Sequence, residues 1–552
     1  MRTQAEDIRP AVDRDSPREI MPELSTAAAE VPLSYSSRAA IAIESQIESL
    51  LSSAGACLGF LLFVCLLCYG YKIFGFHITI DEEIHADYVG QVSQWFAQGR
   101  WGMGLLSAFF LPSTVVPVVS PMLCIGLSAT AWFYLLRNVY SWGNAAAVVA
   151  VSVGISVPML AFTLSFSALA YGVGIANVCL VVFAACLLRK DVASMVVGAL
   201  AGAFAIAVYQ SLVFALLALC LFELIRNPRS PSRIALVRVS VALVLAIAGY
   251  YTIDVAARQF IGTELSYVGS YLDVTGFFAD PWTRFSNSLK SVSQVYWLGQ
   301  ERVGLHSPWL SLVLCIGLAA IVQDSLRRPG AEGISRIAAT AIVLVLPVFA
   351  DAITSGGAPL RSGIYYSVIA CLLVGFGYAV GGATLRSVLV CVAALAVVGD
   401  AMITNRLAGA SATAYQLDRN LAYEILLEVQ RIEPTLTERR VMNLEVVGSK
   451  GWAENRIMPK RETFGASFFE WEGGNRYRVA AFLRLHGLTV VGSSEGERVR
   501  LLERGQAMPA WPLAGWVAID GETVIVKFSK YSAQQGAQLC AAGSVGMCAA
   551  TR

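Results

Sequence analysis

The sequence SSAGACLGFLLFVCLLCYGYKIFGFHITIDEEIHAD, residues 52–87, joins the first strongly apolar run of the chain to its densest group of acidic residues. The run continues to Phe76 and is long enough, at about 1.5 Å of rise per helical residue, to cross a hydrocarbon core of about 30 Å. Four carboxylates then follow within seven residues: Asp81, Glu82, Glu83 and Asp87. This stretch predicts a transmembrane helix that ends at a membrane surface carrying acidic side chains.

The composition assigns the rest of the chain to the same environment. Hydrophobic residues make up 56% of the 552 residues and charged residues 14%, which is outside the usual range of soluble globular proteins. The formal net charge of +2 provides no basic field for nucleic acid. Most cysteines fall in apolar runs, where Cys behaves as a small hydrophobe, and no pair of CxxC motifs suggests a zinc site. The sequence predicts a polytopic membrane protein with the lipid bilayer as a partner and argues against nucleic-acid binding.

Further apolar stretches of membrane-spanning length recur along the chain. Together with the first they cover about 52–76, 113–136, 145–162, 168–188, 192–208, 210–225, 234–256, 307–324, 336–353, 362–381 and 386–403. The run around Tyr209 and Gln210 is too long for one helix, so we expect two spans joined by a tight polar turn. The predicted fold is therefore an α-helical bundle of about eleven transmembrane helices.

Basic residues fall in alternate short loops. They are Arg137, Arg189, Lys190, Arg226, Arg229, Arg233, Arg327, Arg328, Arg336 and Arg386. Such a bias is typical of loops on the cytoplasmic side of a membrane. It predicts a cytoplasmic polar tail at 1–50 and a transmembrane domain at 51–404. The first loop, 77–112, the long aromatic loop, 257–305, and residues 405–552 then lie on the outer side.

Residues 405–552 change in character and predict a small α/β domain. The segment at 414–433 has helical spacing of its apolar residues, and three later segments are rich in β-branched residues as strands are. Within the third of them, Asp520-Gly521 is a hairpin turn signal between VAI and TVIV. Cys540 and Cys548 either form a disulfide, as the oxidising exterior permits, or are free thiols in a disordered tail.

The acidic cluster is followed by an amphipathic segment that begins at Tyr88. We expect this segment to lie flat in the membrane interface and to hold the acids at the level of the headgroups. If 81–88 continues this helix, Asp81, His85 and Tyr88 share one face. If the segment is extended instead, Asp81, Glu83 and His85 share one. The alternative is that these acids are ordinary solvent-exposed residues at the end of the transmembrane helix, without a functional role.

Several short motifs occur in an order that resembles a known family. They are TIDEEIHADY (79–88), GRW (99–101), YQS (209–211), APLRS (358–362), SFFEW (467–471) and MPAWPLAGWVAIDGETVIVKF (508–528). Their order and spacing, from about residue 50 to about residue 530, are similar to those of the GtrII-type glucosyltransferases, membrane enzymes of the GT-C class that modify bacterial O-antigen. Where such enzymes have a DD or DE pair after the first span, this chain has a third acid, which leaves the catalytic residue open.

The resemblance implies transfer of a sugar, typically glucose, from a polyprenyl-phosphate donor to a hydroxyl of lipopolysaccharide O-antigen or a related surface glycan. The reaction would take place on the periplasmic side of the bacterial inner membrane, where the C-terminal domain would also lie. An inverting transfer needs one carboxylate as general base, for which Asp81 and Glu82 are the candidates. It also needs cations to hold the phosphate leaving group, and the candidates are Arg361, Arg100 and Arg258.

Other polar residues are candidates for binding the substrates. They are Asp87 and His85 in the first loop and Tyr209, Gln210, Asp254 and Asp351 in or near the spans. Acids within a span are costly and are usually functional or paired. Tyr209 and Gln210 have the alternative role of a plain turn between helices, and Arg361 and Arg100 that of interfacial anchors. No cofactor is required and no metal site is predicted, although Asp81, Glu82 and His85 could ligate a divalent cation.

Other functions fit part of the pattern. A transporter or flippase for a lipid-linked sugar would also have many spans, but no internal repeat is visible and the acids lie in a loop rather than in mid-membrane. An O-antigen polymerase or ligase would tend to carry its key residues in large, late external loops. A structural or assembly role for the C-terminal domain is the remaining alternative. The membrane glycosyltransferase is the preferred hypothesis.

Overall fold

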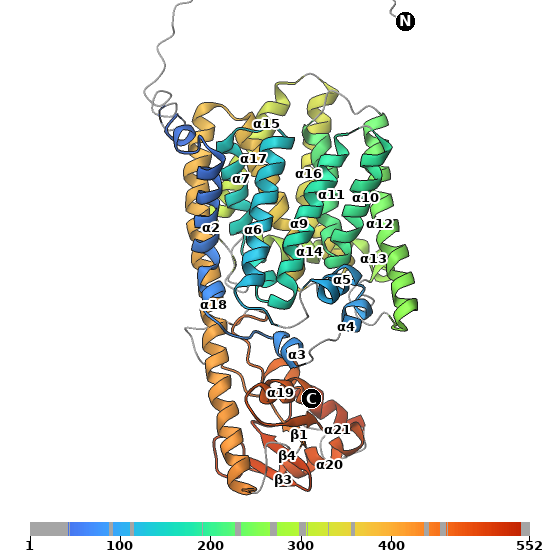
Figure 1. Ribbon diagram of the computed structural model, residues 1–552, viewed down its shortest axis with the longest axis vertical. Coiled ribbons are helices and arrows are strands. Elements are labelled where there is room, and N and C mark those ends of the chain that lie inside the picture. Colours follow the sequence, from blue (N-terminus) through green and yellow to red (C-terminus); the bar gives the residue numbers. More distant parts are fainter. Residues whose placement is uncertain are drawn as a thin grey trace, which may run out of the picture.

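The computed structural model is an elongated molecule with a helical bundle at one end and a smaller domain at the other (Figure 1). It describes residues 42, 45–87, 92–110, 115–189, 191–226, 233–264, 273–296, 305, 307–328, 330–354, 359–434, 441–452, 460 and 462–541. Most of the predicted polar tail at 1–50 therefore lies outside the described residues.

Among the described residues, eight helical segments are long and apolar enough to cross a membrane. They belong to α2 (Ala54–Phe74), α6 (Val119–Tyr134) with η1 (Leu135–Val139), α9 (Ser167–Leu187), α12 (Arg233–Ile261), α15 (Pro308–Leu326), α16 (Ala331–Ile353), α17 (Tyr365–Val380) with η3 (Leu360–Ile364), and α18 (Ala383–Ile432). Shorter helices complete the bundle: α7 (Asn144–Ser156), α8 (Met159–Leu164), α10 (Val192–Val208) and α11 (Leu212–Arg226). The chain is thus a helical membrane protein, and the count of eleven spans stays a prediction.

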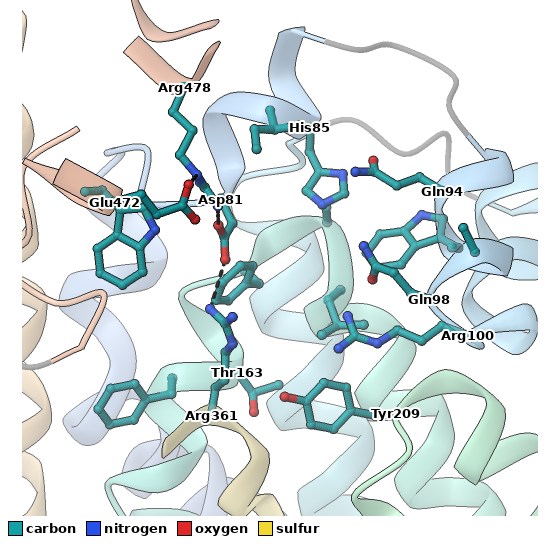
Figure 2. A pocket seen from close by; sticks show the side chains of 18 residues that line it. Asp81, His85, Gln94, Gln98, Arg100, Thr163, Tyr209, Arg361, Glu472 and Arg478 are labelled. Atoms are coloured by element: carbon teal, nitrogen blue, oxygen red, sulfur yellow. Dashed lines mark hydrogen bonds and ion pairs between the residues drawn. The ribbon is translucent and has the colours of Figure 1, made fainter. Parts of the chain in front are cut away.

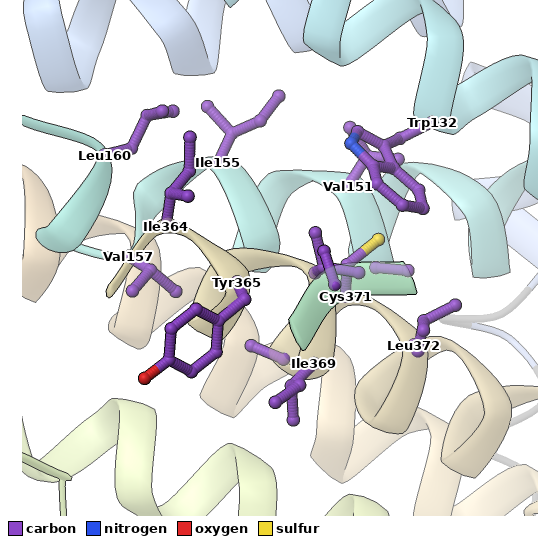
Figure 3. Close-up of a cluster of buried hydrophobic side chains, with 14 of the residues drawn as sticks. Trp132, Val151, Ile155, Val157, Leu160, Ile364, Tyr365, Ile369, Cys371 and Leu372 are labelled. Atoms are coloured by element: carbon purple, nitrogen blue, oxygen red, sulfur yellow. The ribbon is translucent and has the colours of Figure 1, made fainter. Parts of the chain in front are cut away.

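Small residues allow the helices of the bundle to pack closely, as is usual where lipid gives helices no hydrophobic reason to associate. A Cβ added at Gly377 of α17 would lie 2.6 Å from the Cα of Gly317 on α15. One added at Gly154 of α7 would lie 2.9 Å from the carbonyl oxygen of Ser367 on α17. Around these contacts, branched side chains such as Val151 fill the space between α7 and α17 (Figure 3). The interior of the bundle is therefore closely packed.

The predicted pair of helices around Tyr209 is confirmed. Helix α10 ends at Val208, Tyr209 is its C-cap in an extended conformation, and α11 begins at Leu212. The long loop predicted at 257–305 contains helical structure in its described part. Helix α12 continues to Ile261, and two further helices follow, α13 (Val274–Ala279) and α14 (Pro281–Tyr296). Helix α14 is amphipathic, a pattern that the aromatic residues of this region obscure in the sequence.

Helix α18 joins the bundle to the C-terminal domain without interruption. It is 50 residues long, and Figure 1 shows it running beside the bundle and on along the smaller domain. The predicted domain boundary between residues 404 and 405 therefore falls inside a helix. The physical reason is continuity of the buried face, since buried positions recur every three or four residues from Val397 to Val429. One stiff element thus sets the distance between the two parts of the molecule.

The C-terminal part contains the predicted α/β fold. Its strands are β1 (Met442–Val447), β2 (Val490–Gly492), β3 (Val517–Asp520) and β4 (Thr523–Lys527), in the order β2-β1-β4-β3. Strand β1 is parallel to both of its neighbours, and β3 and β4 form the antiparallel hairpin predicted from Asp520-Gly521. Gly521 has a φ of +59°, which suits glycine at this turn.

Three helices pack around this sheet: α19 (Arg476–Leu485), α20 (Glu495–Gln506) and α21 (Ala533–Ala541). The core between α19 and the sheet is aromatic, with the rings of Phe468 and Phe482 stacked 4.2 Å apart. Cys540, in α21, is disulfide-bonded, whereas Cys548 lies outside the described residues. The location of this domain relative to a membrane stays a prediction.

Candidate active site

A polar cavity of about 380 Å³ lies between the end of the bundle and the C-terminal domain. Its walls come from the first loop, from the start of α9, from η3 and from the C-terminal domain. Figure 2 shows the polar side chains that line it: Asp81, His85, Gln94, Gln98, Arg100, Thr163, Tyr209, Arg361, Glu472 and Arg478. The structure therefore brings together residues that are up to 397 positions apart in the chain.

Asp81 occupies a sharp corner where the chain leaves the membrane-spanning helix α2 and turns into α3 (Glu82–Asp87). Its φ is +80°, a region that Asp tolerates better than most residues but that still costs about 1 to 3 kcal/mol. Such strain persists only where the surroundings fix the backbone. Of the two alternatives for residues 81–88, the helical one holds over 82–87, and Tyr88 lies outside the described residues.

Glu82 helps to hold the backbone at this corner. Its carboxylate accepts hydrogen bonds from Thr79 N at 2.9 Å, from the Thr79 hydroxyl at 3.0 Å and from Ser167 N, the first residue of α9, at 2.7 Å. The side chain is 1% exposed and does not line the polar cavity. The two candidate bases thus separate: Asp81 faces the cavity, whereas Glu82 holds the corner to the N-terminus of a helix, where a negative charge is favourable.

Two arginines from different parts of the chain hold the Asp81 carboxylate. Arg361 Nη1 donates to Oδ2 at 2.9 Å, and Arg478 Nη2 donates to Oδ1 at 2.5 Å. Burial alone would raise the pKa of Asp81, but the charges of Arg478 and Arg361 hold it below its usual range. Asp81 is therefore ionised at neutral pH. Each of its oxygens has a second lone pair that can accept a proton or a hydrogen bond.

His85 and Trp95 form the opposite wall of the polar cavity. Their rings stack with 5.0 Å between centroids and 8° between planes. Burial lowers the pKa of His85, so its imidazole is neutral at pH 7 and offers one donor and one acceptor nitrogen. An aromatic face beside neutral polar groups suits the binding of a sugar, which presents both C–H faces and hydroxyls.

A second cavity of about 300 Å³ adjoins the first and has a different character. Most of its lining is apolar or aromatic: Ile206, Val213, Phe214, Ile247, Tyr250, Ala350, Ile353, Pro359 and Tyr365. Three residues line both cavities, namely Arg100, Tyr209 and Arg361. The guanidinium of Arg100 lies over the Tyr209 ring, 4.9 Å from its centroid, and its Nε donates to Gln210 Oε1 at 3.3 Å. The turn at Tyr209 and Gln210 is thus both a connection between helices and a part of the site.

The remaining predicted residues lie outside both cavities. Arg258 pairs with Asp254 at 3.0 Å, one helical turn apart on α12. Asp87 accepts from Arg484 Nε at 2.7 Å. Asp351, in the last turn of α16, lines a separate small cavity of about 80 Å³. Of the three arginines predicted to bind phosphate, two therefore converge and one does not.

Several residues of the site are absent from the sequence prediction. Arg478, Trp471 and Glu472 line the polar cavity from the C-terminal domain, and Glu462 reaches Arg361 Nε at 3.8 Å. Trp471 belongs to the motif SFFEW, so the resemblance contained a signal for it. Arg478 gives no such signal, because an arginine on an amphipathic helix is most often a solvated residue.

No group of three or more His, Cys, Asp or Glu side chains in the part of the chain that the structure describes is arranged to hold a metal ion. Asp81, Glu82 and His85 point in different directions: into the cavity beside arginines, toward α9, and onto Trp95. The expectation that the reaction needs no cofactor stays a prediction.

The fold and the site define a helical membrane protein with a charged, partly enclosed cavity at one end of its bundle. The family model of glucosyl transferase GtrII matches residues 70–374. The chain belongs to this glucosyltransferase family, which confirms the resemblance found in the sequence motifs. The matched residues include Asp81, Arg100 and Arg361, and they end before the C-terminal domain begins. A comparison with curated proteins finds no match.

Proposed function

We propose that this glucosyltransferase moves glucose from a polyprenyl-phosphate donor to a hydroxyl of lipopolysaccharide O-antigen or a related surface glycan. The observation that carries the proposal is the junction of the two cavities at Arg100, Tyr209 and Arg361. A donor of this kind has an apolar chain, a phosphate and a sugar in that order. The apolar cavity, the two arginines and the polar cavity follow one another in the same order.

The junction supplies the groups that a phosphate needs. An Arg guanidinium matches phosphate with two parallel N–H donors and keeps its charge at every working pH. Arg361 and Arg100 approach the junction from η3 and from the start of α5 (Trp101–Phe109). Beyond them, Val213 and Phe214 offer the isoprenoid chain an apolar wall.

In the polar cavity, the transfer proceeds by attack of an acceptor hydroxyl oxygen on the anomeric carbon. Asp81 takes the hydroxyl proton as the new C–O bond forms. The bond between the anomeric carbon and the phosphate oxygen breaks, and the electron pair leaves with the polyprenyl phosphate, whose charge the arginines hold. Attack from the side opposite the leaving group inverts the anomeric configuration. A transporter would instead need a path through the bundle, whereas both cavities lie toward one end of it.

The direct test is transfer by the purified protein in lipid nanodiscs. The donor is polyprenyl-phosphate glucose and the acceptor is a short O-antigen fragment. We expect release of polyprenyl phosphate and formation of the glucosylated acceptor in equal amounts. Donor that crosses a vesicle membrane without release of polyprenyl phosphate would favour the flippase alternative, and absence of product with every lipid-phosphate glucose tested would overturn the proposal.

The periplasmic position of the site is a separate part of the proposal. Support for it comes from the basic residues of the short loops, which point to a cytoplasmic N-terminus. Alkaline phosphatase fused after Gly99 and after Phe528 should be active at both points, because both lie at the same end of the bundle. Inactivity at either point would contradict this topology.

A further inference from the structure

Helix α19 of the C-terminal domain presents two arginines to the first loop. Arg478 donates to Asp81 Oδ1 at 2.5 Å and to Glu83 Oε1 at 2.6 Å, and its Nε lies 3.2 Å from Glu472. Arg484 binds both oxygens of Asp87. These contacts join α19 to α3 across the boundary between the C-terminal domain and the bundle.

The two arginines differ in what they can affect. Arg484 and Asp87 lie outside the polar cavity, so this pair only holds the two parts of the molecule together. Arg478 lines the cavity and contacts the carboxylate that also faces it. Its side chain is 14% exposed, and the Glu83 side chain beneath it is fully buried. Burial raises the pKa of Glu83 to about 8 despite the charge of Arg478. A buried carboxyl that loses its hydrogen-bond partner is destabilising, so Glu83 depends on Arg478.

Arg478 and Arg361 each bind one oxygen of the Asp81 carboxylate. Arg361 approaches from η3 of the bundle, and Arg478 approaches from the C-terminal domain. The orientation of the carboxylate in the cavity therefore depends on both parts of the chain. The family match ends at residue 374, so it accounts for Arg361 but not for Arg478.

We propose that Arg478 is a positioning residue for sugar transfer: it orients the Asp81 carboxylate and compensates its negative charge, so that the C-terminal domain completes the active site. This inference rests on the proposed function. Arg478 does not have to touch either substrate, because it acts through Asp81.

The charged and titratable groups around Asp81 come from every element packed against it. They are Glu83 and His85 of α3, Arg361 of η3, Glu462, and Glu472 and Arg478 of the C-terminal domain. Loss of Arg478 leaves Asp81 close to Glu83 with one cation fewer. The proton affinity of Asp81 then rises, and so does the pH below which it can no longer accept the acceptor proton.

The test measures the pH dependence of transfer in the full-length protein. In Arg478→Gln we expect kcat to fall by about ten- to a hundredfold, and the acid limb of the kcat profile to move up by about one pH unit or more. Arg478→Lys should restore the position of the limb but only part of the rate, because it keeps the charge and loses the planar fork. Arg484→Gln is the matched control, since it weakens the same interface without contact to Asp81, and its acid limb should stay at the wild-type position.

If Arg478→Gln does not fold, a second variant still tests the inference. The double variant Glu83→Gln with Arg478→Gln deletes both members of the buried pair, which is less disruptive than the loss of one. We expect it to fold, as judged by thermal unfolding and gel filtration, and still to show the reduced rate and the raised acid limb.

Two results would overturn the inference while wild-type transfer remains normal. One is a folded Arg478 variant with the wild-type rate and profile. The other is an equal loss in the Arg478 and Arg484 variants with no movement of the limb, which would mean that Arg478 only docks the domain. Absence of transfer by the wild type is a different result, because it overturns the proposed function and with it the role assigned to Arg478.

Discussion

The polar cavity and the apolar cavity lie side by side and share Arg100, Tyr209 and Arg361, yet their other walls have opposite chemistry. Apart from the shared arginines, the charges of the polar one come from the first loop and the C-terminal domain, which are segments outside the bundle. The apolar one is lined mostly by apolar side chains from α10, α11, α12, α16 and α17. Two substrates with opposite solubility could therefore meet at one pair of arginines.

The largest effect should come from the polar cavity, where Asp81→Asn removes the proton acceptor. An amide keeps the size of the side chain but cannot take the proton from the attacking hydroxyl. We expect kcat to fall by about 10²- to 10⁴-fold with little change in KM for the donor. Initial rates of product formation check this, and transfer within about threefold of the wild type would remove Asp81 as the base.

The junction should give the next largest effect. In Arg361→Ala we expect a loss of about ten- to a hundredfold in kcat/KM for the donor, because charge-assisted hydrogen bonds are worth roughly 1.5 to 3 kcal/mol. Arg361→Lys should recover only part of it, since the ammonium lacks the planar fork. Arg361→Ala also leaves Asp81 with one cation fewer, so part of its loss should appear as a raised acid limb of the pH profile.

Arg258→Ala is the control for this prediction. The sequence made both Arg258 and Arg361 candidates, but the structure pairs Arg258 with Asp254 away from both cavities. We expect its transfer rate per folded protein to stay within about twofold of the wild type, because neither member of the pair lines a cavity. Equal losses in the two variants would contradict the position of the junction.

Arg361 and Arg258 illustrate which features of the structure the sequence predicts and which it does not. Apolar length, loop charge and the β-branched segments predicted the helical bundle and the C-terminal sheet, because each is a local property of the chain. The choice between Arg361 and Arg258 depends on which helix ends lie together, and that is a property of packing. Glu82 and Asp81 are neighbours with the same chemistry, and only the corner at Asp81 decides which of them faces the cavity.

The contribution of the C-terminal domain was harder to foresee. Nothing in the segment around Arg478 distinguishes it from a solvated helix face, and its partner Asp81 lies 397 positions earlier. The continuation of one helix through the predicted boundary at residue 404 was hard to foresee for a related reason. A change in composition marks where the chain leaves the bundle, but α18 continues because its buried face does.

The apolar cavity should give a smaller effect that depends on the donor. Val213→Trp fills part of the space assigned to the isoprenoid chain. We expect KM for a long-chain donor to rise about tenfold, which corresponds to about 1.4 kcal/mol of lost apolar contact. For a donor with a single isoprene unit KM should hardly change. Leu200→Trp, on the outward face of α10, is the matched control, and the same increase with both donors would show that the chain does not bind in this cavity.

The smallest effect on transfer should come from Glu82→Gln, which tests whether the acid next to Asp81 belongs to the cavity or to the scaffold. The carboxylate accepts from Thr79 and from Ser167 N at the start of α9, and a glutamine must turn an NH₂ group toward one of these donors. We expect the free energy of unfolding to fall by about 1 to 3 kcal/mol, as for a buried group left without its partner. The rate should fall only a few-fold, and the acid limb should not move, because Asp81 keeps both arginines. Thermal unfolding and the pH profile of transfer measure the two quantities separately. A loss of rate as large as that in Asp81→Asn, in a variant that is as stable as the wild type, would make Glu82 the proton acceptor and would require a different arrangement of the first loop during the reaction.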